Sequence, residues 1–301
     1  MNINHLAIFH AVAEEGSVTR AAERLCISQP AVSKQLRELE KTLGMALFHR
    51  LSKGVQLTEA GELLLGYSRQ LFALEAEAEQ ALRELWALER GRLRVGASTT
   101  IGTYLLPEIC AQFSQRYPGI EMQLEIANSR TVEQLLRDNK IDLALTEGPA
   151  EATDIKLEVW LEDELVVIAP PYHPLVQEPV ITVERLCAEP FIWREVGSGT
   201  QAIIEQALQT KGLQVQAAMS LGSTEAIKRA VAAGMGISIV SCLTIGAELA
   251  AGTLIVLPII DFSIYRPLHR LRLTGKYEGR AAREFVKLLK QSITKDLSSY
   301  L

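Results

Sequence analysis

Two short helical patterns meet at a tight polar turn between residues 17 and 43, and this feature limits the fold of the N-terminal part most strongly. Ser17 and Ser28 stand where the two helices would begin, and serine is favoured there because its hydroxyl accepts a backbone N–H. The apolar positions of the second pattern recur at spacings of four, three and four residues: Val32, Leu36, Leu39 and Leu43. This spacing predicts one buried helix face. The two patterns together predict a helix-turn-helix.

The opposite face of the second pattern is polar and basic, as contact with DNA requires. Its members are Gln29, Ser33, Lys34, Arg37 and Lys41. In the major groove glutamine pairs with adenine and arginine with guanine, whereas phosphate contacts add affinity with little sequence information. The face therefore predicts a helix that reads DNA. For Gln29 alone, ordinary surface polarity is the alternative.

Charge is distributed unevenly along the chain, although the whole sequence carries a formal net charge of −5. Residues 20–53 hold seven basic and three acidic side chains, while residues 59–89 hold two basic and seven acidic ones. Binding to phosphate needs a local basic surface and does not depend on the charge of the whole chain. The acidic total therefore does not exclude a nucleic-acid partner.

Export, metal binding and membrane insertion are all disfavoured by the sequence. The N-terminus lacks the positively charged segment of a signal peptide, and glycine and hydroxyl residues interrupt the uncharged stretch 230–247. We therefore expect a cytoplasmic protein with no membrane partner, no metal and no cofactor beyond a small-molecule effector. The cysteines form no C-x-x-C pair, which favours free thiols: Cys26, Cys110, Cys187 and Cys242.

A long helix is predicted from Thr58 to about Leu88, because this segment has no proline and is rich in alanine, leucine and glutamate. At about 1.5 Å per residue it would extend roughly 45 Å, which is too long to lie against the head that precedes it. We expect its apolar residues to form a seam with a second subunit, and packing on the same chain is the alternative. They fill the a and d positions of four heptads: Leu64, Tyr67, Leu71, Leu74, Ala78, Ala81, Leu85 and Leu88.

Strand-like and helix-like segments alternate from Gly91 onwards, over residues 91–146 and again over residues 191–241. Such alternation is typical of a parallel α/β sheet. Further strands are expected at 165–169 and 271–274, before a last helix that begins at Arg280. The expected fold class is therefore α/β with an all-α-type N-terminal head.

Hydroxyl and glycine residues follow four of these strands, and three of the segments precede helices. Ligands of α/β sheets bind at the carboxyl ends of strands, where backbone N–H groups and hydroxyls favour a small anion. Each serine or threonine alone could be a helix cap, and the glycine segment at 197–200 lacks the ending of a P-loop. Their recurrence predicts an effector site made of Ser98, Thr99, Thr100, Thr146, Glu147, Ser198, Gly199, Thr200, Ser223 and Thr224.

Over essentially its whole length the sequence resembles the LysR-type transcriptional regulators. The N-terminal likeness rests on FHAVAEEGSVTRAAERLCISQPAVSKQLRELEKTLGMALFHR (9–50) and LTEAG (57–61). The C-terminal likeness rests on ASTTIGTYLLP (97–107), DLALTEGP (142–149), WLEDELVVIAPPYHPL (160–175) and REVGSGT (194–200). The C-terminal segments look like the subgroup that contains regulators of sulfur assimilation, sulfite response and carbon-dioxide fixation genes.

The resemblance implies a winged helix-turn-helix at 1–58, a linker dimerisation helix at 59–89 and a periplasmic-binding-protein-like effector domain at 90–301. That domain would have lobe I at about 90–164 and 267–301 and lobe II at about 165–266. The expected partners are double-stranded promoter DNA and further copies of the chain in a homotetramer, while contact with RNA polymerase is left open. The expected DNA-binding residues are Thr19, Arg20, Gln29, Pro30, Ser33, Lys34, Arg37, Arg50 and Lys53.

The expected effector is a small anion, with a sulfur oxyanion as the first choice, bound between the two lobes. An aromatic acid, an amino acid and a phosphorylated metabolite are the alternatives. The subgroup often has an arginine directly after GSGT, and this chain has Gln201 there. A cation that would hold the anion is therefore missing from that position.

The sequence argues against two other classes of protein. An enzyme is disfavoured, because the sequence shows no nucleophile–base pair, no dinucleotide fingerprint and no metal-binding histidine spacing. A solute-binding protein for transport would suit the C-terminal part alone, but the attached helix-turn-helix argues against it. We therefore expect a regulator that is not an enzyme.

Overall fold

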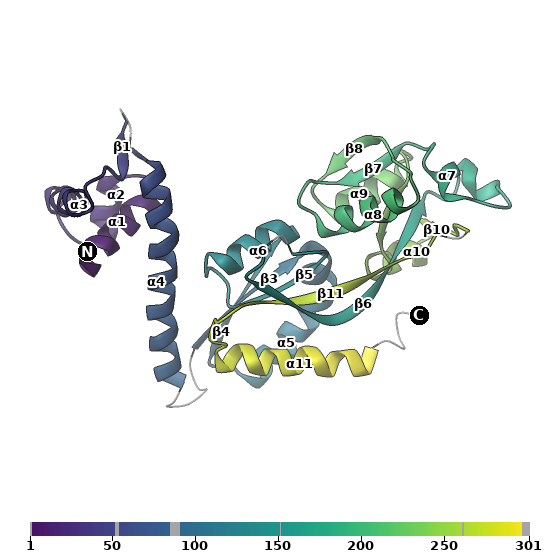
Figure 1. Ribbon diagram of the computed structural model, residues 1–301. Helices are drawn as coiled ribbons and strands as arrows, with labels where there is room; N and C mark the ends of the chain where they lie inside the picture. Colours follow the sequence, from purple (N-terminus) through teal and green to yellow (C-terminus); the bar gives the residue numbers. More distant parts are fainter. Residues whose placement is uncertain (1, 52–53, 85–90, 151, 261, 297–301) are drawn as a thin grey trace. The chain divides into compact units, whose positions relative to one another are not determined.

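The chain divides into two compact units, residues 1–83 and residues 84–301 (Figure 1). Three residues to which the sequence assigned a role, Lys53, Leu85 and Leu88, lie outside the described residues, as do the side chains of Arg50 and Ala81. The computed structural model describes residues 2–51, 54–84, 91–150, 152–260 and 262–296.

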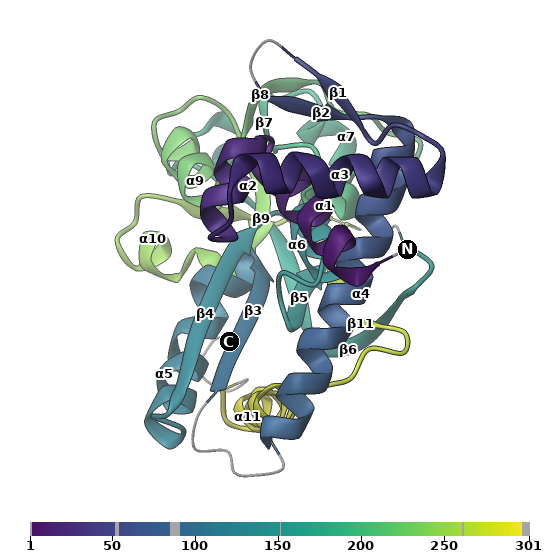
Figure 2. The ribbon, with the colours of Figure 1, turned by 90° about the vertical axis from the view of Figure 1, so that its left-hand side faces the viewer.

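The first unit contains the predicted helix-turn-helix. The Ser17 hydroxyl accepts the Arg20 backbone N–H, and the Ser28 hydroxyl accepts that of Ala31, so both predicted caps are confirmed. Helix α3 lies across α1 and α2 (Figure 2), and Val32 and Leu39 are fully buried in the core that they share. The elements are α1 (Ile3–Glu15), α2 (Val18–Arg24), α3 (Gln29–Leu43), β1 (Phe48–Arg50), β2 (Val55–Leu57) and α4 (Glu59–Glu84).

The second unit begins with a parallel sheet whose successive strands along the chain are joined by helices, as the alternating pattern predicted. Strand β3 pairs in parallel with both β4 and β5. Helices α5 and α11 cover one face of this sheet and α6 covers the other (Figure 1). The elements of this first lobe are β3 (Gly91–Ser98), the π-helical turn η1 (Ile101–Leu105), α5 (Leu106–Arg116), β4 (Ile120–Ala127), α6 (Ser129–Arg137), β5 (Leu143–Glu147) and α11 (Arg280–Asp296).

Two long antiparallel strands connect the first lobe with a second one, and they are β6 (Ile155–Ala169) and β11 (Ile264–Leu273). The sequence predicted only residues 165–169 and 271–274 of them, because charged residues such as Glu162, Asp163 and Arg266 interrupt the apolar pattern. The elements of the second lobe are η2 (Pro174–Gln177), α7 (Val183–Leu186), β7 (Phe191–Arg194), α8 (Gly199–Thr210), β8 (Ala217–Leu221), α9 (Thr224–Ala232), β9 (Ser238–Ser241), η3 (Cys242–Thr244), α10 (Gly246–Ala250) and β10 (Ile255–Leu257).

The main sheet runs in the order β10-β6-β11-β5-β3-β4, with β9 also paired to β6, and β7 and β8 form a separate parallel pair. The carboxyl ends of β3, β5 and β7 carry Ser98, Glu147 and Arg194, which are all buried. The predicted effector segments therefore lie at the strand ends where α/β proteins bind ligands.

Candidate DNA-binding face and ligand site

The polar face of α3 is accessible. Gln29, Lys34 and Arg37 are exposed, and Ser33 is half-buried. The Arg37 Nε donates to the Ser33 carbonyl oxygen at 3.1 Å, which orients the guanidinium along the helix. The Lys34 ammonium lies 4.0 Å from the Glu38 carboxylate, a surface pair too weak to withhold the lysine from a phosphate. The face thus offers the donors that contact with a DNA groove needs.

The hairpin β1–β2 is held against the end of α1 by a close approach of two glycines. The Val55 N–H donates to the Gly16 carbonyl oxygen at 3.2 Å. A Cβ atom on Gly54 would lie 2.7 Å from that same oxygen, and Gly54 has a φ of +81°, so a larger residue would displace the hairpin. Thr19 and Arg20, two further candidates, are exposed on α2.

Helix α4 carries an apolar row that the first unit leaves uncovered. Leu74 is 63% exposed and Leu63, which the heptad pattern did not include, is 66% exposed. Leu64 instead packs partly against the core of its own unit, so its place in a seam stays a prediction. The exposed members of the predicted row are Tyr67, Leu71, Leu74 and Ala78.

The two lobes meet at Arg194, a buried residue at the end of β7. Its Nη2 donates to the Thr99 hydroxyl of the first lobe at 2.9 Å, and its Nη1 donates to the Thr224 hydroxyl of the second lobe at 3.2 Å. Its Nε also donates to the neighbouring Glu195 carboxylate at 2.8 Å. Two of the predicted segments are thus brought together by a cation that the prediction did not include.

A second contact between the lobes joins Thr200 to Glu147. The Thr200 hydroxyl donates to Glu147 Oε1 at 3.3 Å and accepts Arg266 Nη1 at 2.7 Å. At Gly199, a Cβ atom would lie 2.0 Å from the Glu147 carbonyl oxygen, so only glycine allows this approach of backbone to backbone. Ser198 caps α8 through the Gln201 N–H, and Ser223 caps α9 through the Ala226 N–H.

Arg266 is fully buried between two carboxylates. Its Nη2 lies 2.7 Å from Asp163 Oδ2, and its Nη1 lies 3.6 Å from Glu147 Oε1. Burial raises the pKa of Asp163, although Arg266 and a hydrogen bond from the Ser241 hydroxyl act in the opposite direction. This cluster takes members from β5, β6, β9 and β11 and so ties the connecting strands to both lobes.

Lys228 on α9 forms a third link between the lobes. The buried ammonium lies 2.7 Å from Glu225 and 2.8 Å from Glu248, and 5.2 Å from the centre of the Tyr104 ring of the first lobe. The Tyr104 hydroxyl donates to the Glu225 carboxylate. Burial, followed by this hydrogen bond, raises the pKa of Tyr104 to about 12. The tyrosine therefore keeps its proton and the hydrogen bond at neutral pH.

The remaining candidates line the strand ends of the first lobe. Ser98, Thr100 and Thr146 are buried there. Within the described part of the chain, the hydroxyl of Ser98 and one carboxylate oxygen of Glu147 have no hydrogen-bond partner. Buried polar groups without partners are uncommon and costly, so this end of the sheet is suited to a polar ligand.

Three residues of this site escaped the sequence prediction: Asp163, Arg194 and Arg266. Arg194 and Arg266 each stand beside apolar or aromatic residues of a strand, whereas Asp163 lies between Glu162 and Glu164. A charged side chain in an apolar strand is the signal that could have found the two arginines, because such groups are rarely buried unless they are paired. The acidic run around Asp163 gives no such signal.

Comparison with known protein families decides the identity of the chain. The model of the bacterial regulatory helix-turn-helix protein, lysR family, matches residues 3–62, and the model of the LysR substrate binding domain matches residues 87–294. The chain belongs to the LysR family of transcriptional regulators. The resemblance found in the sequence is therefore confirmed.

Proteins described as transcriptional regulators are similar to the chain over most of their length. The RuBisCO operon transcriptional regulator of Allochromatium vinosum is 40% identical over 289 residues, covering 95% of both chains. The regulatory domain of CcmR from Synechocystis PCC6803, solved in complex with 2-PG, is 36% identical with a TM-score of 0.64, covering 69% of this chain and 99% of that one. A point variant of full-length OxyR from Pseudomonas aeruginosa is 24% identical with a TM-score of 0.73, covering 98% and 95%, and shares the fold.

The LysR family binds DNA through its helix-turn-helix and is not enzymatic, so the sequence-based expectations of a DNA partner and of no enzyme activity are confirmed. The predicted fold class, with head, linker helix and two-lobed α/β domain, is confirmed as well. No helix among the described residues combines the length and the apolarity needed to cross a bilayer.

Proposed function

We propose that this LysR regulator binds a small phosphorylated carboxylic acid between its two lobes. The resulting change in the angle between the lobes is transmitted to paired DNA-binding heads. The observation that carries the proposal is the position of Arg194, whose guanidinium is shared between a threonine of each lobe. Arginine is the side chain best suited to bidentate contact with phosphate or carboxylate. A ligand that binds this cation would compete with the contacts that now join the lobes.

The ligand class comes from the site and from the relatives together. The hydroxyl-rich strand ends favoured a small anion, and the resemblance to a subgroup with sulfur regulators made a sulfur oxyanion the first choice. The comparisons give the sulfur oxyanion no support and favour the phosphorylated alternative. CcmR, a relative at 36% identity, was solved with 2-PG, which we take as 2-phosphoglycolate. Arg194 would supply the cation that is absent directly after GSGT, where this chain has Gln201. Donors for the rest of such a ligand are the hydroxyls of Ser98, Thr99, Thr100, Thr146, Ser198, Ser223 and Thr224 and the Gly199 N–H.

The buried carboxylate of Glu147 would repel an anion if its charge were free. Arg266 lies 3.6 Å from it, and the Thr200 hydroxyl donates to it. We therefore assign Glu147 a positioning role, in which it orients Thr200 from the opposite lobe.

On the DNA side, we propose that Gln29 and Ser33 reach base edges, while Lys34 and Arg37 contact guanine or phosphate. Arg50 and Lys53 would act from the hairpin as a wing. Thr19 and Arg20 at the start of α2 and Pro30 at the start of α3 would bind or align the DNA backbone.

The exposed apolar row on α4 supports a homodimer. One recognition helix reads too few base pairs for specificity in a genome, and two related by symmetry read a palindrome. Ligand binding would change the angle between the lobes, and the linker helices would carry this change to the spacing of the heads. Coupling of this kind needs a difference of only about 1–3 kcal/mol between two arrangements.

Calorimetric titration of the full-length protein with 2-phosphoglycolate tests the ligand class. We expect binding to the unaltered protein and a loss of about tenfold or more in Arg194→Gln, because a charged hydrogen bond is lost. Arg229→Gln is the matched control, since Arg229 is exposed on α9 of the same lobe. Binding of sulfite or an aromatic acid, with no heat from 2-phosphoglycolate, would contradict the proposal.

A further inference from the structure

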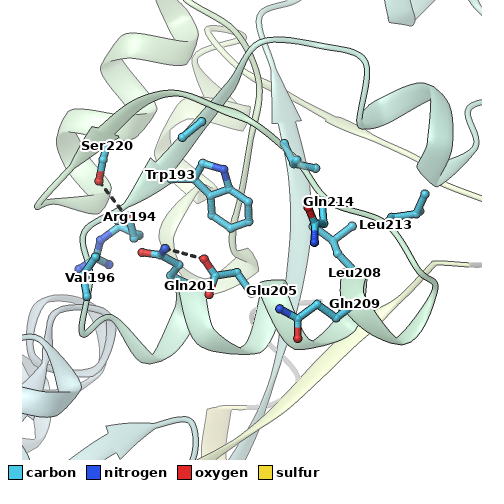
Figure 3. Close-up of a pocket in the computed structure, with 12 residues that line it drawn as sticks. Trp193, Arg194, Val196, Gln201, Glu205, Leu208, Gln209, Leu213, Gln214 and Ser220 are labelled. Carbon is cyan, nitrogen blue, oxygen red and sulfur yellow. Dashed lines mark hydrogen bonds between the residues drawn. The ribbon is translucent and has the colours of Figure 1, made fainter.

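A pocket of about 380 Å³ opens in the second lobe between helix α8 and the strand pair β7–β8 (Figure 3). Its apolar surface is formed by Trp193 together with leucine, valine and alanine side chains. The indole of Trp193 lies opposite Gln201 and Glu205 (Figure 3). The polar residues that line it are Gln201, Glu205, Gln209, Gln214 and Ser220.

The polar side of the pocket is a row on α8. Gln201, Glu205 and Gln209 are four residues apart and therefore share one helix face. Gln201 Nε2 donates to Glu205 Oε1 at 2.7 Å. In the described part of the chain, Gln201 Oε1 is buried with no hydrogen-bond partner, and Glu205 forms no ion pair. The row thus presents acceptors and one unneutralised negative charge.

Arg194 is the only cation among the lining residues, and its charge is directed elsewhere. Its guanidinium is bound by Thr99, Thr224 and Glu195. At the pocket, the Arg194 carbonyl oxygen accepts the hydroxyl of Ser220, another lining residue, at 3.1 Å (Figure 3). The pocket therefore disfavours an anion and suits a flat apolar group that carries N–H donors or a positive charge.

This pocket and the site between the lobes are built on the same two elements. Thr200, the second residue of α8, contacts Glu147 and Arg266, while the next residue, Gln201, lines the pocket. On β7, Arg194 contributes its guanidinium to one site and its carbonyl oxygen to the other. A displacement of α8 by one ligand would change the geometry offered to the other.

We propose that this pocket is a second ligand site, which binds a flat cationic amino-heterocycle or aromatic amidine and is coupled to the site between the lobes. Glu205 pairs with the cation, the glutamine amides accept its N–H groups, and Trp193 packs on the ring. The coupling rests on the proposed function, whereas the existence of the pocket site does not.

Calorimetric titrations of the full-length protein with benzamidine and with benzoate test the site, because the two probes have the same shape and opposite charge. We expect benzamidine to bind and benzoate not to bind. Glu205→Gln should weaken benzamidine about tenfold or more through loss of a charged hydrogen bond. Glu108→Gln, which changes an exposed carboxylate of α5 in the first lobe, should leave the affinity unchanged. No binding of benzamidine, equal binding to the Glu205 variant, or binding of benzoate would overturn the proposal.

A titration of 2-phosphoglycolate in saturating benzamidine then tests the coupling. We expect its affinity to change about fivefold or more, and benzamidine affinity to change by the same factor in the reciprocal titration. Unchanged affinities would overturn the coupling. If 2-phosphoglycolate fails to bind at all, the proposed function fails, and the comparison of wild type with Glu205→Gln still decides the pocket.

Discussion

Arg194 at the end of β7 donates a hydrogen bond of 2.9 Å to Thr99 at the end of β3, and so joins the two lobes through one buried cation. The same guanidinium holds Thr224 of its own lobe. A buried arginine shared in this way can exchange partners for an anionic ligand without leaving its charge unpaired. The proposed ligand site and the contact between the lobes therefore share the same side chains.

Loss of Arg37 should reduce discrimination between the operator and a scrambled site by about 1–3 kcal/mol. The guanidinium is exposed on α3 and oriented by the Ser33 carbonyl oxygen. Fluorescence anisotropy with both DNAs measures the effect for Arg37→Ala. Arg24→Ala is the control, because Arg24 lies on α2 and pairs with Glu15. Unchanged affinity of Arg37→Ala for both DNAs would refute the role of this side chain.

Replacing Leu74 by a charged residue should separate the subunits. Leu74 is 63% exposed in the described chain and stands in the apolar row of α4. A carboxylate there would be buried in the seam, which is costly when it has no partner. Sedimentation velocity should show Leu74→Glu as a smaller species than wild type. Ala76→Glu, which is exposed at an outer heptad position of the same helix, should keep the wild-type size. A dimeric Leu74→Glu protein would rule out this seam.

Arg266→Met should destabilise the second unit by about 3–5 kcal/mol, because it leaves two buried carboxylates without their cation. Arg272→Met on the same strand should cost about 1 kcal/mol or less, since its pair with Glu158 is at the surface. Chemical denaturation of both variants measures these free energies of unfolding. Similar losses of unfolding free energy in the two variants would show that the buried cluster stabilises the protein no more than the surface pair does.

The same cluster predicts a pH dependence. The pKa of Asp163 is raised in the folded protein, mainly by burial, so above its ordinary value of 3.8 the folded state binds more protons than the unfolded state. The contribution of Asp163 to stability should therefore be fully present below pH 3.8 and be lost as the pH rises through the raised pKa. Asp163 faces Arg266, Glu147, Ser241 and Cys242. Melting curves of wild type and Asp163→Asn between pH 4 and pH 7, about the range in question, measure the difference. A wild-type advantage that grows with pH would show the opposite shift.

Removing the Tyr104 hydroxyl should loosen the second lobe at α9. Tyr104→Phe loses the hydrogen bond to Glu225 and leaves Lys228 with its two carboxylates. Hydrogen–deuterium exchange should become faster over residues 224–232. Tyr117→Phe is the matched control, because its hydroxyl bonds to Glu284 within the first lobe at 3.1 Å. Equal exchange in wild type and Tyr104→Phe would mean that this hydrogen bond does not hold the lobes.

The periodic parts of the chain were predictable from the sequence. Helix α3 has a regular apolar spacing and a serine cap, and the alternation around β3 and β5 has local causes as well. Strand β6 was predicted only over its last five residues, because its first part pairs with β11 from a distance and carries several charges. Local patterns do not report a partner strand about a hundred residues away.

The candidate ligand site was predictable as a set of strand ends but not as a set of contacts. Thr99 and Thr200 were predicted as site residues because hydroxyls follow strands at equivalent points of the sheet, and both lie at contacts between the lobes. Arg194 and Arg266 were not, because their roles depend on Thr99 and Glu147 approaching them from the other lobe. The sequence indicated that a cation is missing at Gln201, and we propose that Arg194, seven positions earlier, supplies that charge.

Gly199 limits how the two lobes can move relative to each other. At this point the backbone of one lobe rests on the Glu147 carbonyl of the other with no side chain between them. A side chain at such a contact could change its rotamer, whereas two backbones in contact cannot adjust in this way. A small rotation of either lobe must therefore move the start of α8. A single methyl group at position 199 would push the Glu147 carbonyl and the start of α8 apart, so Gly199→Ala should change the angle between the lobes without any ligand.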